Sequence, residues 1–368
     1  MDATTLNREW GVITSLLPSG WRELARETGA LRRARQVRDP GTLLFLILLH
    51  VASGLSLRQA AARAQVMGLA KISDVALMKR LRGAERWLHA LAARMYLSSP
   101  FHNPTSDAPP TRRIRVVDAT NVTEPGSTGT DWRIHYVLQL PSLECDFFEV
   151  TDVSGGESYT RLPVRAGDVI LGDRGYAHRE GVASVLRSGG DVVVRLNASN
   201  FPLLRDGRAF DLLAAARTLK EHEPSEWRVE FEASGERHSA RVCAVRKSDE
   251  AAERAKKQVV RSAGKKGRQV QSATLEMAEY IVVLTTLGEQ TTTTQVLELY
   301  RSRWQVELAF KRIKTLFGVG HVPKADPESA RAWIYGKLLA VLLIERLLQE
   351  ARFFSPWGFT LGQSKSLA

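Results

Sequence analysis

The chain has 368 residues, of which 44% are hydrophobic and 25% are charged, so it has room for two or three domains with ordinary buried cores. Its formal net charge of +12 favours a polyanionic partner, and nucleic acid is the usual one. The longest apolar run, Leu43 to Leu49, is too short to cross a bilayer, and the N-terminus lacks a signal-peptide pattern, so a membrane or secreted protein is disfavoured.

Residues 1–105 are predicted to form a helical DNA-binding domain. Up to about residue 98 the sequence shows no strand-like alternation and holds fifteen Lys and Arg against seven Asp and Glu. Within it, a helix, a turn at Gly68 and a second helix capped by Ser73 or Asp74 resemble a helix-turn-helix. A surface helix with a solvated basic face is the alternative to DNA contact. The basic side chains of the second helix are Lys79, Arg80, Arg82 and Arg86.

After a Pro- and Ser-rich linker, the apolar pattern changes to that of strands. Segments such as "RIRVVDAT", "DVILGDRGY" and "DVVVRLN" read as strands, and "REGVASVLRS" reads as a helix. Strands followed by alternating strands and helices predict an α/β fold with a mixed sheet and helices packed on it. Asp118 and Asp173 each end an apolar strand, and Asp118 shares a strand face with Thr120.

Residues 201–287 are predicted to form a β-rich insertion. Strand patterns such as "EWRVEFEAS" and "EYIVVLTTL" flank a polar, basic stretch over residues 251–271. We expect that stretch to be a loop, which is either disordered or in contact with phosphates. Helices return from about residue 294 to residue 353, and residues 354–368 form a C-terminal tail.

A single helix is predicted over residues 299–314, "LYRSRWQVELAFKRIK". At 100° per residue, Tyr300, Arg303, Glu307 and Lys314 fall within an arc of about 60°, and Lys311 borders the same stripe. An apolar edge made by Leu297, Trp304 and Leu308 is expected to face the fold. Taken alone, the stripe is equally typical of a surface helix with an Arg303–Glu307 ion pair.

Three carboxylates therefore stand at positions where they could meet. Asp118 and Asp173 end strands of one predicted sheet, and Glu307 lies on the polar stripe. Mg²⁺ prefers oxygen ligands, and carboxylates that hold two such ions support phosphodiester chemistry. Tyr300, Arg303 and Lys314 would then bind backbone phosphates beside the cleavage point.

The chain resembles a known family in these residues. The Tyr300, Arg303, Glu307 and Lys314 row resembles the Y-R-E-K signature of DDE transposases of the IS-four group of insertion sequences. "VVDAT" and "LGDRGY" resemble the first and second aspartate blocks of that family, and the resemblance covers roughly residues 40–350.

The resemblance implies a ribonuclease-H-like DDE catalytic domain formed by residues 106–200 and 288–353. It implies that Asp118, Asp173 and Glu307 hold two Mg²⁺ ions, with Mn²⁺ as a substitute. It further implies DNA contacts by Arg195 and by a residue of the insertion that stacks on a flipped base. Tyr280 is the best match for that residue and Trp227 a weaker one, with core packing of Tyr280 as the alternative. We also expect DNA contacts by Arg174, which follows Asp173, and by Lys311, which borders the polar stripe.

The activity implied by the resemblance is cut-and-paste transposition. The protein would bind terminal inverted repeats, cleave DNA through a hairpin intermediate and join it to target DNA, as a homodimer in the synaptic complex. Two cysteines without metal or disulfide spacing favour a reduced cytoplasmic compartment. The resemblance implies a bacterial host and association with the nucleoid. Rival interpretations are a catalytically silent repressor, a nuclease of the same fold and, fitting the charge poorly, a two-carboxylate glycosidase. Three histidines carry weaker signals: His135 and His321 as structural residues and His178 near the site.

Overall fold

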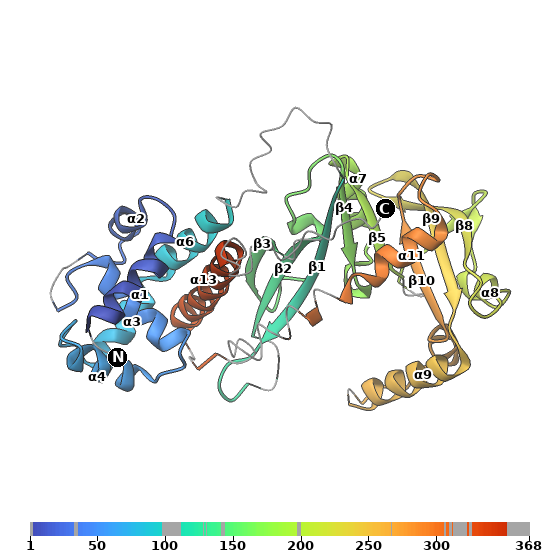
Figure 1. The fold of residues 1–368 in the computed structure, drawn as a ribbon. Coiled ribbons are helices and arrows are strands. Elements are labelled where there is room, and N and C mark those ends of the chain that lie inside the picture. Colours follow the sequence, from blue (N-terminus) through green and yellow to red (C-terminus); the bar gives the residue numbers. More distant parts are fainter. Residues whose placement is uncertain are drawn as a thin grey trace. The chain divides into compact units, whose positions relative to one another are not determined.

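The computed structural model describes residues 3–32, 36–97, 112–127, 129, 131–140, 144–196, 200–265, 267–304, 307–308, 311, 322–323 and 326–351 (Figure 1). The chain forms two compact units. One contains residues 1–107, 121–133 and 310–368, and the other contains residues 108–120 and 134–309. None of the described helices has the length and apolar character needed to span a membrane.

The first unit is built from helices whose starts are encoded locally. Asp39 caps α3 by accepting a hydrogen bond from the Thr42 amide at 2.9 Å, and Ser56 caps α4 in a reciprocal capping box with Gln59. Ser73 caps α5 through the Ala76 amide. The helices of this unit are α1 (Ala3–Ser15), α2 (Trp21–Glu27), α3 (Pro40–Val51), α4 (Leu57–Val66), α5 (Asp74–Gly83), α6 (Glu85–Leu97) and α13 (Pro327–Ala351).

The apolar run of α3 lies in the core of this helical unit. Leu43, Leu44 and Leu46 are fully buried, as expected for a helix that is apolar on all sides. The long helix α13 packs against α6, α5 and α3, and Arg331 on α13 forms an ion pair with Glu85 at 2.7 Å. The segment 288–353, assigned from sequence to the catalytic domain, is thus divided between the two units.

A ten-stranded mixed sheet dominates the rest of the described chain. Strands β1, β4 and β5 are parallel, and β5, β10, β9 and β8 pair antiparallel in turn. The mixed sheet predicted from the sequence is therefore present. In spatial order the strands are β3 (Glu144–Asp152), β2 (Trp132–Leu140), β1 (Arg113–Val122), β4 (Asp168–Gly172), β5 (Asp191–Arg195), β10 (Tyr280–Thr285), β9 (Glu236–Arg246), β8 (Ser225–Ala233), β6 (Leu204–Arg205) and β7 (Arg208–Ala209).

Short helical segments connect and cover these strands. A 3₁₀ turn, η3, and helix α7 link β4 to β5, because parallel neighbours need a crossover connection. Helix α11 packs on β5, β9 and β10. The bounds are η2 (Tyr159–Arg161), η3 (Arg174–Tyr176), α7 (Arg179–Arg187), α8 (Leu212–Ala216), α10 (Ser272–Met277) and α11 (Thr293–Arg301).

The strands of the predicted β-rich insertion extend the same sheet, because β10 pairs directly with β5. The loop predicted over residues 251–271 is wrong for most of its length, since α9 spans Asp249–Gly264. Ser248 caps this helix, Asp249 and Glu250 stand in its first turn, and Ala, Lys and Arg are strong helix formers. Local helix propensity therefore prevails over the polar composition that suggested a loop.

Candidate active site

The prediction that Asp118 ends its strand is wrong, because β1 continues to Val122. The register of β1 and β4 nevertheless brings Asp118, inside β1, and Asp173, directly after β4, to the same level. Arg113 pairs with Asp168 and Val116 with Leu171, so Asp118 and Asp173 each lie two residues beyond paired positions on adjacent parallel strands. Such strands are about 4.8 Å apart. At the opposite end of both strands, Arg113 and Asp168 form an ion pair with N–O separation 2.7 Å. The sheet therefore holds the two carboxylates at one edge.

Local hydrogen bonds orient both carboxylates. Asp173 caps η3, and its Oδ1 accepts a hydrogen bond from the Gly175 amide at 2.8 Å. The Oδ1 of Asp118 accepts one from the amide of Ala119, also at 2.8 Å. Each carboxylate keeps acceptor capacity beyond this single bond.

The environment of Asp118 disfavours its charged form. Burial raises the pKa of Asp118 to about 7; the Ala119 amide opposes this rise, and Asp173 adds to it by charge repulsion. Arg303 lowers the pKa and Glu157 raises it, so both groups lie within electrostatic range. Two carboxylates that repel each other at a half-buried site are a suitable set of oxygen ligands for a divalent cation.

The two glycines that flank Asp173 make room for side chains beneath the turn. A Cβ on Gly172 would collide with the hydroxyl of Tyr159, whose ring lies 5.3 Å from that of Tyr176. A Cβ on Gly175 would collide with a carboxylate oxygen of Glu157 and lie 3.1 Å from Oδ1 of Asp173. "LGDRGY" therefore needs both glycines for close packing rather than for a positive φ.

Glu157 is a residue that the sequence analysis missed. Its carboxylate approaches the Asp173 turn and acts electrostatically on Asp118. It lies in the irregular segment before η2, where neither strand nor helix periodicity gives a signal. Only the folded path of the chain brings it to the two aspartates.

The predicted helix over residues 299–314 is wrong as a single element. Helix α11 ends at Arg301, and the amides of Ser302 and Arg303 donate to the carbonyls of Leu299 and Tyr300 at 3.1 and 3.0 Å. These i to i−3 bonds tighten the chain into a turn. Residues 304, 307, 308 and 311 are again helical. The apolar edge is not buried as expected, because Trp304 is 50% exposed and Leu308 is 39% exposed.

Arg303 connects the polar row to the aspartates. Its guanidinium lies 5.8 Å from the ring centre of the buried Tyr300 and forms an ion pair with the exposed Glu307. Burial lowers the pKa of Arg303, but Tyr300 and Glu307 outweigh it and hold the pKa above its ordinary value. The charge of Arg303 also lowers the pKa of Asp118. Arg303 therefore interacts with both Glu307 and that aspartate.

The structure brings Asp118 and Asp173 to the same level of adjacent strands, with Glu157 within electrostatic range of Asp118, and Glu307 forms an ion pair with Arg303. Among the residues that the structure describes, no three His, Cys, Asp or Glu side chains are grouped as a metal site. The role of Glu307 as third metal ligand stays a prediction. Lys311 is exposed, and Lys314 lies outside the described residues.

The other predicted DNA contacts of this unit occupy different surroundings. Arg174 follows Asp173 and is exposed, and Arg195 ends β5 opposite Val283. Tyr280 is buried in the hydrophobic core, which favours packing over base stacking. Trp227 is partly buried, with its ring 6.0 Å from that of Phe210.

Of the three histidines considered from the sequence, the two that the structure describes are not grouped with the acidic residues as a metal site. His135 is buried and contacts Thr151 Oγ1 at 3.2 Å, a structural role. His178 is exposed and precedes α7 without a capping hydrogen bond from its side chain. His321 lies outside the described residues.

In the helical unit, the basic side chains of α5 have two different kinds of surroundings. Lys79 and Arg80, together with Lys71 and Ser73, line a hollow of about 570 Å³ at the start of α5. Arg82 instead forms ion pairs with Glu328 and Asp326.

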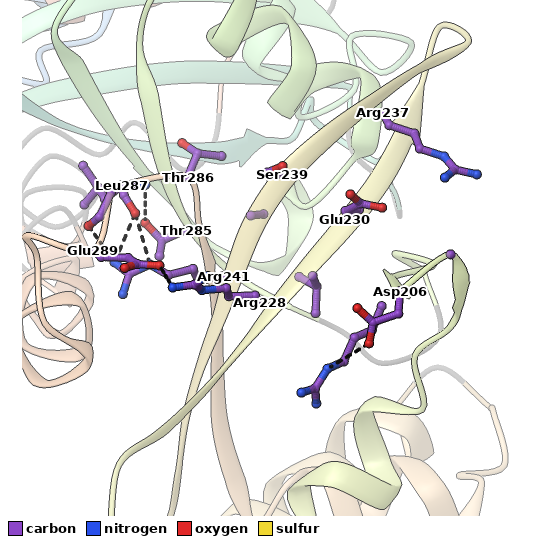
Figure 2. Close-up of a pocket in the computed structure, with 15 residues that line it drawn as sticks. Asp206, Arg228, Glu230, Arg237, Ser239, Arg241, Thr285, Thr286, Leu287 and Glu289 are labelled. Atoms are coloured by element: carbon purple, nitrogen blue, oxygen red, sulfur yellow. Dashed lines mark hydrogen bonds and ion pairs between the residues drawn. The ribbon is translucent and has the colours of Figure 1, made fainter.

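A second hollow, of about 750 Å³, lies along β8 and β9, apart from the aspartates (Figure 2). Its buried Arg241 donates to the carbonyls of Leu287, Gly288 and Thr291, and Arg228 pairs with Glu289. Figure 2 shows these side chains turned toward their partners. Because the arginines at its wall already have acceptors, this hollow is better explained as structural.

Comparisons with known proteins identify the family of the chain. Residues 150–343 match the model of the family described as Transposase DDE domain. The chain is 36% identical over 341 residues to the putative transposase InsL of insertion sequence IS186A from Escherichia coli, covering 90% of this chain and 91% of that protein. It is 36% identical over 342 residues to the IS421 transposase of Escherichia coli, with the same coverage.

Two more distant proteins also align with the chain. The transposase of IS231C from Bacillus thuringiensis is 26% identical over 377 residues, covering 92% of this chain and 78% of that protein. The cryo-EM structure of the piggyBac transposase synaptic complex with hairpin DNA aligns with a TM-score of 0.45 and 10% identity, over 94% of this chain and 80% of that one. A similarity of that size does not establish a shared fold.

Proposed function

Because the chain belongs to the DDE transposases of insertion sequences, enzymes that cut and transfer DNA, we propose that it binds the terminal inverted repeats of its own element and catalyses Mg²⁺-dependent cleavage and strand transfer. The resemblance to the IS-four group is thereby confirmed at the level of the family. The observation that carries the proposal is that Asp118, inside β1, and Asp173, directly after β4, lie at the same level of two adjacent parallel strands.

The donor set fits a divalent cation. Asp118 and Asp173 offer hard oxygen ligands. The two carboxylates repel each other, which helps to raise the pKa of Asp118, and a bound cation would reduce this repulsion. Asp118 and Asp173 would hold Mg²⁺, and Glu307 is proposed as the third ligand of a two-ion site with a ribonuclease-H-like arrangement. When bound, such ions activate water and stabilise the leaving oxygen.

The side chains around the acids would position the DNA. Arg303, supported by Tyr300 and Glu307, can bind a backbone phosphate beside the reacting bond. Hydrolysis, hairpin formation and strand transfer would use the same residues in turn, because each step is an in-line displacement at phosphorus. No nucleophile from the protein is needed.

The remaining parts of the proposal concern assembly. The basic helices of the first unit would recognise the terminal repeats, and a homodimer would hold two DNA ends. The predicted base-stacking residue remains part of the proposal, although the burial of Tyr280 makes Trp227 the more accessible of the two candidates.

The test is a cleavage assay with the full-length protein and a labelled duplex that carries the element's own end and its flanking DNA. With Mg²⁺, the wild type should release a 3′-hydroxyl end and hairpin-ended products, whereas Ca²⁺ should support binding alone. Asp118→Asn and Asp173→Asn should bind the duplex and leave it uncut.

Asp152→Asn is the matched control, because Asp152 ends a strand of the sheet but is exposed and bonds locally to Ser154. It should cleave like the wild type. Cleavage that survives Asp118→Asn would reject the acidic site, and end binding by the wild type without any cleavage would favour the repressor alternative.

A further inference from the structure

Three cationic side chains gather at one edge of the sheet. Arg174 follows Asp173 at the end of β4, Arg195 is the last residue of β5, and Lys247 directly follows β9. Strands β4 and β5 are parallel, and β9 runs in the same direction because both β5 and β9 are antiparallel to β10. All three strands therefore end at the edge that carries the aspartates.

The three groups act on one another. Arg174 is exposed and lies within electrostatic range of Arg195. Burial, with smaller contributions from Arg195 and Arg174, lowers the pKa of Lys247 to about 8. Lys247 is half-buried, with its ammonium donating to the carbonyl of Ala278. The fold thus brings three positive charges into mutual repulsion, which costs free energy unless an anion is present.

Within the described chain, no carboxylate forms an ion pair with any of the three. Asp173 acts on Arg174 at longer range, and the Nε of Arg195 is buried without a hydrogen-bond partner. Arg228 and Arg241 of the hollow in Figure 2 differ, since each forms an ion pair with a carboxylate. Uncompensated cations beside an acidic site are typical of a surface that binds phosphate.

We propose that Arg174, Arg195 and Lys247 form one binding site for a backbone phosphate of the DNA strand held at Asp118 and Asp173. Lys247 is the new member of this site, and it belongs to the segment that adds strands to the core sheet. The proposal rests on the proposed function, because it takes the bound polyanion to be DNA. Lysine supplies a compact charge and the arginines supply forked donors, so together they fix the strand relative to the acids.

The experiment measures binding of a labelled duplex that carries the element's end to the full-length protein in Ca²⁺, at several concentrations of monovalent salt. Lys247→Gln should reduce the slope of log affinity against log salt by about 0.9, which weakens binding by about eightfold at 0.1 M salt. Lys247→Arg should restore the wild-type slope. Lys220→Gln is the matched control, because Lys220 is exposed and already lies 3.8 Å from Glu223, and it should leave the slope unchanged.

A structural role for Lys247, holding the carbonyl of Ala278, would lower the melting temperature of Lys247→Gln and leave the salt slope at its wild-type value, which would overturn the proposal. If Lys247→Gln does not fold, acetylation of wild-type lysines by an N-hydroxysuccinimide ester decides. DNA should then protect Lys247, and equal labelling with and without DNA would overturn the proposal. Failure of the wild type to cleave is a separate outcome that touches only the proposed function.

Discussion

At the scale of single residues, Asp118 shows how a site can work against the stability of its own fold. The sheet places this carboxyl group beside Asp173 and Glu157 and withdraws it partly from water, so its charged form is disfavoured. A group arranged only for stability would have a lowered pKa instead, as Asp152 has through its bonds to Ser154. A carboxyl group whose charged form is disfavoured in this way is what the proposed metal site requires.

The first prediction concerns stability against pH in a chelating buffer. Because the pKa of Asp118 is raised from 3.8 to about 7, the folded state holds the proton more tightly than the unfolded state. The contribution of this group is fully present below pH 4 and is lost as the pH rises through 7. Asp118→Asn should therefore be more stable than the wild type at pH 8, by on the order of 2 kcal/mol after solvent screening, and lose this advantage at pH 4.

Thermal melts at pH 4 to 8 check this expectation. Addition of Mg²⁺ at pH 8 should raise the melting temperature of the wild type and leave that of Asp118→Asn unchanged. Asp152→Asn should show no gain at pH 8, because the pKa of that carboxyl is lowered. Equal stability of Asp118→Asn and the wild type at every pH would contradict the inferred environment.

Gly175 gives a second prediction at this scale. In Gly175→Ala the new methyl group would displace the Glu157 carboxylate and press on Asp173, whereas Gly156 has open space around its Cα. DNA cleavage by Gly175→Ala should fall by roughly 10- to 100-fold while binding is kept. Gly156→Ala, in the same irregular segment, should cleave normally. Single-turnover rates distinguish the two, and a Gly175→Ala enzyme of full activity would show that the turn tolerates the added carbon.

At the scale of elements, the sequence predicted most where the pattern is local. The strand that precedes Asp173 and the helix that joins β4 to β5 follow from alternation and from Gly punctuation, whereas β1 continues past Asp118 to Val122. The levels of Asp118 and Asp173 depend on strand pairing, which no local pattern encodes. For the same reason Glu157 and Lys247 could not be found, because their neighbours lie on other strands.

Two elements show the limits of periodicity. The stripe over residues 299–314 correctly grouped Arg303 with Glu307, yet the helix tightens at Ser302 and the apolar edge is exposed. The basic stretch before β10 looked like a loop, but the Ser248 cap and good helix formers make it α9. A capping residue is therefore good evidence for the start of a helix, whereas a polar composition is weak evidence that a helix is absent.

Helix α5 gives the prediction that belongs to this scale. Lys79 lines a hollow that faces solvent, whereas Arg82 is engaged by Glu328 of α13. If α5 contacts DNA, Lys79→Gln should reduce the salt slope of end binding by about 0.9 with an unchanged melting temperature. Arg82→Gln should lower the melting temperature slightly and change the slope less. A fluorescence binding titration and a thermal melt on each variant provide the comparison, and the reverse pattern would place the DNA elsewhere.

At the scale of the whole molecule, the helical unit is discontinuous in sequence. Residues 1–107 form one compact unit with residues 121–133 and 310–368. A reading along the chain assigns residues 288–353 to the catalytic domain because neighbours in sequence are the default neighbours in space. Packing of α13 on α6, α5 and α3 shows why that default fails here, since α13 supplies an apolar face that those helices need.

The last prediction follows from this packing. Leu339 on α13 is fully buried, so Leu339→Ala should destabilise the helical unit by roughly 2–5 kcal/mol, whereas Leu348→Ala, at a position 59% exposed, should change stability by less than about 0.5 kcal/mol. The loss of stability should expose segments that are distant from Leu339 in the sequence. Under limited proteolysis, peptides from residues 3–97 should be released sooner in Leu339→Ala, while residues 134–304 stay protected. Mass spectrometry identifies the early fragments. If only residues 326–351 are cut and residues 3–97 stay intact, α13 is not required for the stability of the N-terminal helices.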